Sequence, residues 1–71
     1  MSSTIMNLMI NGKEMEVPEG ISIADFLLHH NLQPKSVVVE VNKVIIEREK
    51  YNEVSLKEGD TVEIVRFIGG G

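Results

Sequence analysis

The first quarter of the chain alternates between apolar and polar residues, as β-strands do. β-Forming residues run from Thr4 to Ile10, and a second short run extends from Lys13 to Val17. Between the two runs stands Asn11-Gly12, the dipeptide favoured in type I′ turns, because both central residues of that turn need a positive φ. The pattern therefore predicts a β-hairpin over residues 4–17.

A short helix is predicted after the break at residues 18–20, where a proline and a glycine interrupt the strand. Ser22 supplies a capping hydroxyl three residues before Asp25, whose negative charge suits a helix N-terminus. Asn31 and Pro34 are expected to end the helix. Apolar spacing of i, i+3, i+4 and i+7 places four residues on one face of it: Ile23, Phe26, Leu27 and His30.

Three further strands follow the helix. Alternation over Val37 to Val41 predicts one, and Asn42-Lys43 turns it back into a short strand at Val44 to Ile46. The last strand is predicted over Thr61 to Phe67, after a turn at residues 57–60. The predicted order is a hairpin, a helix and three strands. The only compact way to cover one face of such a sheet with a single helix is the β-grasp arrangement, an α+β fold.

The predicted β-grasp domain covers residues 1–67, with a C-terminal tail at 68–71. It has a mixed sheet of four to five strands, one helix across one face, and its last strand beside and parallel to its first. The charge-rich stretch 47–53, with Tyr51 as its one aromatic residue, is expected to be a solvated connection. The expected core consists of Met6, Leu8, Ile10, Ile23, Leu27, Val37, Val39, Val41, Val62 and Ile64.

Composition and charge exclude several classes of function. The 71 residues carry a net charge of -4, which disfavours nucleic acid and anionic membrane surfaces as partners. The absence of cysteine excludes both a disulfide scaffold and a thiolate metal site. No signal-peptide pattern and no apolar run of membrane-spanning length is found, so a cytoplasmic protein is expected.

Few residues offer enzymatic chemistry. The sequence contains no phosphate-binding loop, no dinucleotide fingerprint and no HExxH motif. His29 and His30 are adjacent on the predicted helix, so their side chains diverge by about 100 degrees and do not converge easily on one metal ion. Met6 and Met15 are interpreted as packing residues. No bound cofactor and no metal site is expected.

The C-terminus is the most distinctive candidate. Gly69, Gly70 and Gly71 follow an apolar strand without a polar spacer, and three residues without Cβ atoms can extend about 10 Å from a folded body. The terminal carboxylate is ionised at neutral pH and is a poor electrophile. Acyl chemistry at Gly71 would need activation by a separate ATP-using enzyme, and sulfur could be carried only as a thiocarboxylate. The plain alternative is a frayed end or an expression scar.

A second candidate is the outward face of the sheet. If Val62 and Ile64 are buried, alternation places Val65 and Phe67 outside, together with Met9 and Ile5 of the first strand. These residues, with Ile68, are expected to form one apolar docking patch beside the tail. The alternative is that the patch serves only as a weak dimer or crystal contact.

The chain resembles the ThiS family of sulfur carriers in thiamine biosynthesis, which share a ubiquitin-like fold with MoaD. A third glycine, Gly69, departs from the family pattern, in which many members have another small residue at that position. The resemblance is carried by Asn11-Gly12, Ser22 to Leu27, Val41 to Ile46, Arg48-Glu49, Tyr51, Glu58-Gly59-Asp60 and the terminal Gly70-Gly71.

The resemblance implies a carrier rather than an enzyme. A ThiF-like adenylyltransferase would use ATP and magnesium to convert Gly71 to an acyl-adenylate. A sulfur donor, such as a cysteine desulfurase persulfide, would then leave a thiocarboxylate for a ThiG-like thiazole synthase. The free protein is expected to be a monomer.

Three alternatives stay open from the sequence. The first is a carrier for molybdopterin synthesis or for protein or tRNA thiolation. The second is a β-grasp interaction domain with an inert tail, and the third is autonomous catalysis by the two histidines. The acceptor, the sulfur donor and the oligomeric state are not fixed by the sequence.

Overall fold

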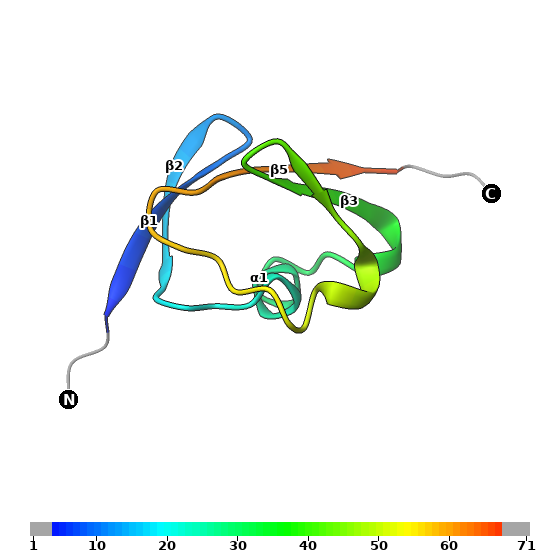
Figure 1. Cartoon of the computed structure of the whole chain (residues 1–71), viewed down its shortest axis with the longest axis horizontal. Helices are drawn as coiled ribbons and strands as arrows, with labels where there is room; N and C mark the ends of the chain where they lie inside the picture. The colour runs from blue at the N-terminus through cyan, green and yellow to red at the C-terminus, as the bar shows by residue number, and fades with distance from the viewer. Residues whose placement is uncertain (1–3, 68–71) are drawn as a thin grey trace.

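The computed structural model describes residues 4–67, which form a five-stranded mixed sheet with one helix packed against one face (Figure 1). The predicted α+β, β-grasp class is thereby confirmed. The elements in chain order are β1 (Ile5–Ile10), β2 (Lys13–Pro18), α1 (Ile23–His29), β3 (Val37–Val41), β4 (Val44–Ile46) and β5 (Thr61–Arg66), with short 3-10 helices η1 (Pro34–Ser36) and η2 (Arg48–Lys50).

The strand order is β2-β1-β5-β3-β4, so the last strand in sequence is the central strand of the sheet. β5 runs parallel to β1, as predicted for the first and last strands, and antiparallel to β3. The two hairpins, β1–β2 and β3–β4, therefore flank β5 on either side. Both hairpins are closed by two-residue turns with positive φ at both positions, at Asn11-Gly12 and at Asn42-Lys43.

Helix α1 begins and ends at the residues that the sequence indicates. The Ser22 hydroxyl accepts a hydrogen bond from the Asp25 amide at 3.0 Å, which satisfies one of the free N–H groups of the first turn. At the other end Asn31 has φ 57°, and the Leu32 amide donates to the Leu27 carbonyl at 2.9 Å. This left-handed cap reverses the chain toward η1 and β3.

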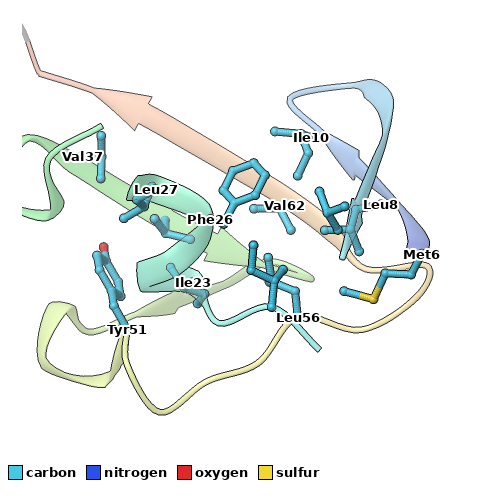
Figure 2. Packing of buried hydrophobic residues seen from close by; sticks show 13 residues of the cluster. Met6, Leu8, Ile10, Ile23, Phe26, Leu27, Val37, Tyr51, Leu56 and Val62 are labelled. Atoms are coloured by element: carbon cyan, nitrogen blue, oxygen red, sulfur yellow. The ribbon is translucent and has the colours of Figure 1, made fainter. Parts of the chain in front are cut away.

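The core lies between the helix and the inner face of the sheet (Figure 2). Most of the predicted core residues are buried, although Val41 and Ile64 are only partly buried. His30, which the spacing placed on the apolar face of the helix, is exposed. His30 instead rests against Phe26, with ring centroids 4.4 Å apart. The buried residues are Met6, Leu8, Ile10, Val17, Ile21, Ile23, Phe26, Leu27, Val37, Val39, Tyr51, Leu56 and Val62, with Met15 packed against them.

The stretch 47–53 was predicted to be a solvated connection, and at Tyr51 this prediction is wrong; Leu56, just beyond that stretch, is buried as well. Tyr51 is 4% exposed and Leu56 1%, and Figure 2 shows both beside helix α1. The backbone holds them there, because the Ala24 amide donates to the Tyr51 carbonyl at 2.9 Å and the Leu56 amide to that of Ile21 at 2.8 Å. A single helix of seven residues leaves part of the sheet's inner face open, and this segment covers the remainder.

Candidate functional site

The strand that leads to the C-terminus is paired with β3 along its length. The Asn42 amide donates to the Thr61 carbonyl at 2.7 Å at the start of β5. At its end the Phe67 amide donates to the Ser36 carbonyl at 2.9 Å, one residue beyond the strand. The body of the domain therefore fixes the direction in which the chain leaves it at least as far as Phe67.

On the opposite side, β1 ends before β5 does, and the side chain of Asn11 continues the pairing. Asn11 Oδ1 accepts from the Ile64 amide at 2.8 Å, and its Nδ2 donates to the Ile64 carbonyl at 3.3 Å. The Asn11 amide itself donates to the Val62 carbonyl at 2.9 Å. A side-chain amide carries the same donor and acceptor as a peptide group, so Asn11 replaces the next residue of the parallel ladder.

Asn42 bridges to the start of the same strand. Its Oδ1 accepts from the Thr61 amide at 3.0 Å, and its Nδ2 donates to Asp60 Oδ1 at 2.9 Å. Asp60 Oδ2 in turn accepts from the Lys57 amide at 2.9 Å, which closes the turn before β5. The central strand is thus held by one asparagine from each hairpin turn.

The four C-terminal residues, Ile68, Gly69, Gly70 and Gly71, lie outside the described residues. The prediction of a separate tail at 68–71, and the roles assigned to these residues, therefore stay predictions.

The outward apolar residues are exposed as the alternation predicts, but they do not form one patch. Ile5, Met9, Val65 and Phe67 are each more than one third exposed. The parallel register pairs Met9 with Thr61, so Val65 lies four residues beyond Met9 and Ile5 four residues before it. At about 3.3 Å per residue, Ile5 and Val65 are separated by roughly 26 Å along the strands. The expectation of one continuous patch is wrong, because neighbouring strands share a patch only where their register brings the residues level.

The structure places a different neighbour beside Val65. Val38 of β3 is its direct cross-strand partner and shares its face of the sheet. We call Val38, Val65 and Phe67 the tail-side patch. The next pair along the same strands and face is Glu40 and Glu63, so two carboxylates border this patch. A docking partner for it needs an apolar surface with basic groups at that border.

The histidines occupy consecutive positions, at the end of α1 and at its C-cap. Within residues 4–67, no three His, Cys, Asp or Glu side chains come together as metal ligands. No helix in that same range is long and apolar enough to cross a bilayer.

Sequence reasoning assigned Asn11 and Asn42 only to turns, and it missed their contacts with β5. A turn asparagine is recognisable from its local sequence, whereas its contact with residues 53 or 18 positions away depends on the sheet order. Val38 was missed in the docking surface because the pairing of β3 with β5 was not predicted.

The fold and the placement of its last strand define a small ubiquitin-like β-grasp protein. The model of the ThiS family matches residues 7–71. The chain is 45% identical over 65 residues to the sulfur carrier protein ThiS of Bacillus subtilis, covering 90% of this chain and 98% of that protein. The crystal structure of the thiamine biosynthesis protein ThiS from Geobacter metallireducens superposes with a TM-score of 0.80 at 38% identity, over 93% of this chain and all of that one. The chain belongs to the ThiS family.

A thiazole synthase of Magnetococcus marinus is also similar, at 36% identity over 66 residues. That match covers 93% of this chain but only 20% of the synthase. The chain thus corresponds to one fifth of a longer protein that is named for a synthase activity.

Proposed function

We propose that this protein carries sulfur for thiazole formation in thiamine biosynthesis on the carboxyl group of Gly71, and that the tail 68–71 is functionally separate from the β-grasp body. The observation that supports this most is the position of β5. The last strand is the central strand, hydrogen-bonded on both sides, and the run of three glycines begins two residues after Phe67. The body then acts as a rigid support, and the chemistry is supplied by other proteins.

The chemistry at Gly71 follows from the low reactivity of a carboxylate. An adenylyltransferase would join the carboxylate to the α-phosphate of ATP, in the presence of magnesium, and release pyrophosphate. Sulfide would then attack the acyl carbon and release AMP, which leaves a thiocarboxylate without any change of oxidation state. A persulfide donor would give an acyl disulfide instead, and a thiol reductant would have to cleave its S–S bond.

The similarity to a thiazole synthase supports a synthase of that kind as the sulfur acceptor. In Magnetococcus marinus a region similar to this chain accounts for one fifth of the synthase. A carrier region within the same polypeptide has a high effective concentration at the synthase active site. A separate carrier would need a docking surface to achieve the same encounter.

Intact-mass spectrometry tests the proposed chemistry. The purified protein is incubated with a ThiF-like adenylyltransferase, ATP, magnesium and sulfide. The expected product has one oxygen replaced by sulfur, and tandem fragmentation places the change on the last residue. Deletion of Gly71 should abolish it, while substitution of both histidines by alanine should leave it unchanged. A protein whose mass never changes, or whose native C-terminus extends past Gly71, would contradict the proposal.

The proposed docking surface is the tail-side patch together with Ile68. Ile5 and Met9 stay proposed contact residues only for a partner broad enough to span the sheet face, given their distance from Val65. Phe67 is 51% exposed and Ile5 54%, so aspartate at either position should leave the fold stable. We expect Phe67→Asp to weaken binding to the synthase by about tenfold or more, because a buried, unpaired charge at an interface centre is costly.

Ile5→Asp is the matched control for this binding experiment. It introduces the same charge at the same exposure on the same sheet face, and we expect it to change the affinity by less than about threefold. Calorimetric titration with the synthase measures both variants. Equal losses would show that the partner covers the whole face, and a large fall in the melting temperature of Phe67→Asp would show that Phe67 is a core residue.

A further inference from the structure

The two edges of the sheet differ in how well they are protected against pairing with another strand. Edge strands are commonly blocked by charges or proline. β2, at one edge, has three charged residues among its six and ends at Pro18. β4, at the other edge, has only apolar residues, and Val44 and Ile45 are 59% and 64% exposed.

The backbone of β4 has free hydrogen-bonding groups at its centre. Asn42 donates to Thr61, and Ser36 accepts from Phe67, so the even-numbered residues of β3 direct their peptide groups toward β5. Val39 and Val41 must therefore bond to β4, where their partners are Ile46 and Val44. The N–H and C=O groups of Ile45 consequently point away from the sheet.

The residues that flank β4 make this edge complementary to itself. The sequence Lys43-Val44-Ile45-Ile46-Glu47 carries a cation at one end and an anion at the other. We infer that β4 pairs antiparallel with β4 of a second copy of this chain, centred on Ile45. In that register each Lys43 faces Glu47 of the second copy. Because the dimer has two-fold symmetry, this charge pair occurs twice.

The side chains of the inner face also fit this register. Each Val44 lies opposite Ile46 of the second copy, which covers one of the most exposed apolar residues of the described structure. A surface groove beside β4 is lined by Ile45, Ile46, Glu47, Lys50 and Val54. Three of these five side chains are apolar, so an entering Val44 has apolar side chains to contact.

The backbone conformation of Lys43 is consistent with this role. Its φ is 72°, in the left-handed region where the turn favours glycine. Backbone preference thus gives no reason for a lysine there, whereas the proposed pair with Glu47 uses its charge.

The association is expected to be weak, because three-residue strands bury little surface compared with a stable interface. It revises the expectation of a monomer at high protein concentration. β3 separates β4 from β5, so the pairing does not use the strand that leads to Gly71. Its test is accordingly independent of sulfur transfer.

The experiment combines sedimentation velocity and amide NMR of the full chain over a dilution series. The weight-average sedimentation coefficient should rise with concentration, and the amide shifts that move most should be those of residues 43–47. Lys43→Glu should weaken self-association by about tenfold, because both charge pairs become repulsive at once. Glu47→Lys should do the same, while Glu19→Lys, an exposed charge reversal in the turn after β2, should have no such effect.

Mixing the two variants is the decisive step. Lys43→Glu has two anions at this edge and Glu47→Lys has two cations, so an equimolar mixture should associate at least as well as the wild-type protein. The double variant Lys43→Glu/Glu47→Lys should also recover self-association. A mixture that stays monomeric, unmoved amides at residues 43–47, or wild-type association of either single variant would overturn the inference. Circular dichroism of each variant confirms that it is folded.

Discussion

The two hairpin turns both have positive φ at their two central residues, but their asparagine side chains bond to different positions of β5. Asn11 and Asn42 have φ values of 51° and 53°, and each donates its backbone amide to a carbonyl of β5. The Asn42 side chain bonds at Thr61, where the strand begins, and to Asp60 in the turn before it. The Asn11 side chain bonds at Ile64, beyond the end of β1 and toward the C-terminus.

The second central residue of the turn differs between the two hairpins, and the difference changes the backbone strain. The first turn has glycine at this position, with φ 84°, and the second has Lys43, with φ 72°. Glycine takes such a conformation without steric penalty, whereas lysine is strained there. The comparison shows that the asparagine side chain has the same structural role in both turns, whereas the residue after it does not.

Asn42→Ala should have the largest effect on stability. It removes the acceptor for the Thr61 amide and the donor to Asp60, and it places a Cβ-bearing residue without a local hydrogen bond at φ 53°. We expect a loss of about 2 kcal/mol in the free energy of unfolding, measured by urea denaturation. Asn42→Gly is the control that keeps the backbone freedom; if it is as stable as the wild-type protein, the side-chain bonds contribute nothing.

Asn11→Ala should cost somewhat less, about 1.5 kcal/mol, because one of its two side-chain bonds is long at 3.3 Å. Its local signature should be faster hydrogen exchange at the Ile64 amide, which donates to Asn11. Asn11→Asp keeps the acceptor and should retain most of the protection. Unchanged exchange at Ile64 in Asn11→Ala would show that water replaces the side chain without loss.

Gly12→Ala measures the cost of the positive φ by itself, because a Cβ built at Gly12 meets no atom within 4 Å and causes no clash. The expected loss is about 1 kcal/mol, and it comes from the positive φ alone. Gly12→Asn should lose less, because asparagine tolerates the left-handed region. Thermal denaturation of both variants checks this order, and an alanine variant as stable as the asparagine variant would contradict it.

Lys43→Gly should have the smallest effect and the opposite sign. Relief of the strained φ is partly offset by the greater freedom of glycine in the unfolded chain, so we expect a gain of about 0.5 kcal/mol. The measurement is chemical denaturation at low protein concentration, where self-association does not contribute. A loss of stability would show that the Lys43 side chain makes a favourable contact within one copy.

Much of the fold could be predicted because its signals are local. The Asn-Gly turn, the serine cap before α1 and the alternation of β3 and β5 each depend on residues close together in sequence. Of the candidate site, the exposure of Val65 and Phe67 followed from alternation, and the resemblance to the ThiS family was confirmed. The burial of Tyr51 was not predictable from its charged neighbours, because it depends on how much of the sheet the seven-residue helix leaves uncovered.

The sequence by itself determined the elements, their order and the family, since periodicity, caps and turns act within a few residues. Only the tertiary structure decided which residues share a surface. The stagger of β1 against β5 separates Ile5 and Met9 from Val65 and Phe67, and the pairing of β3 with β5 supplies Val38 instead. Register between distant strands is set by the packing of the whole sheet against its core, which no single segment of the sequence encodes.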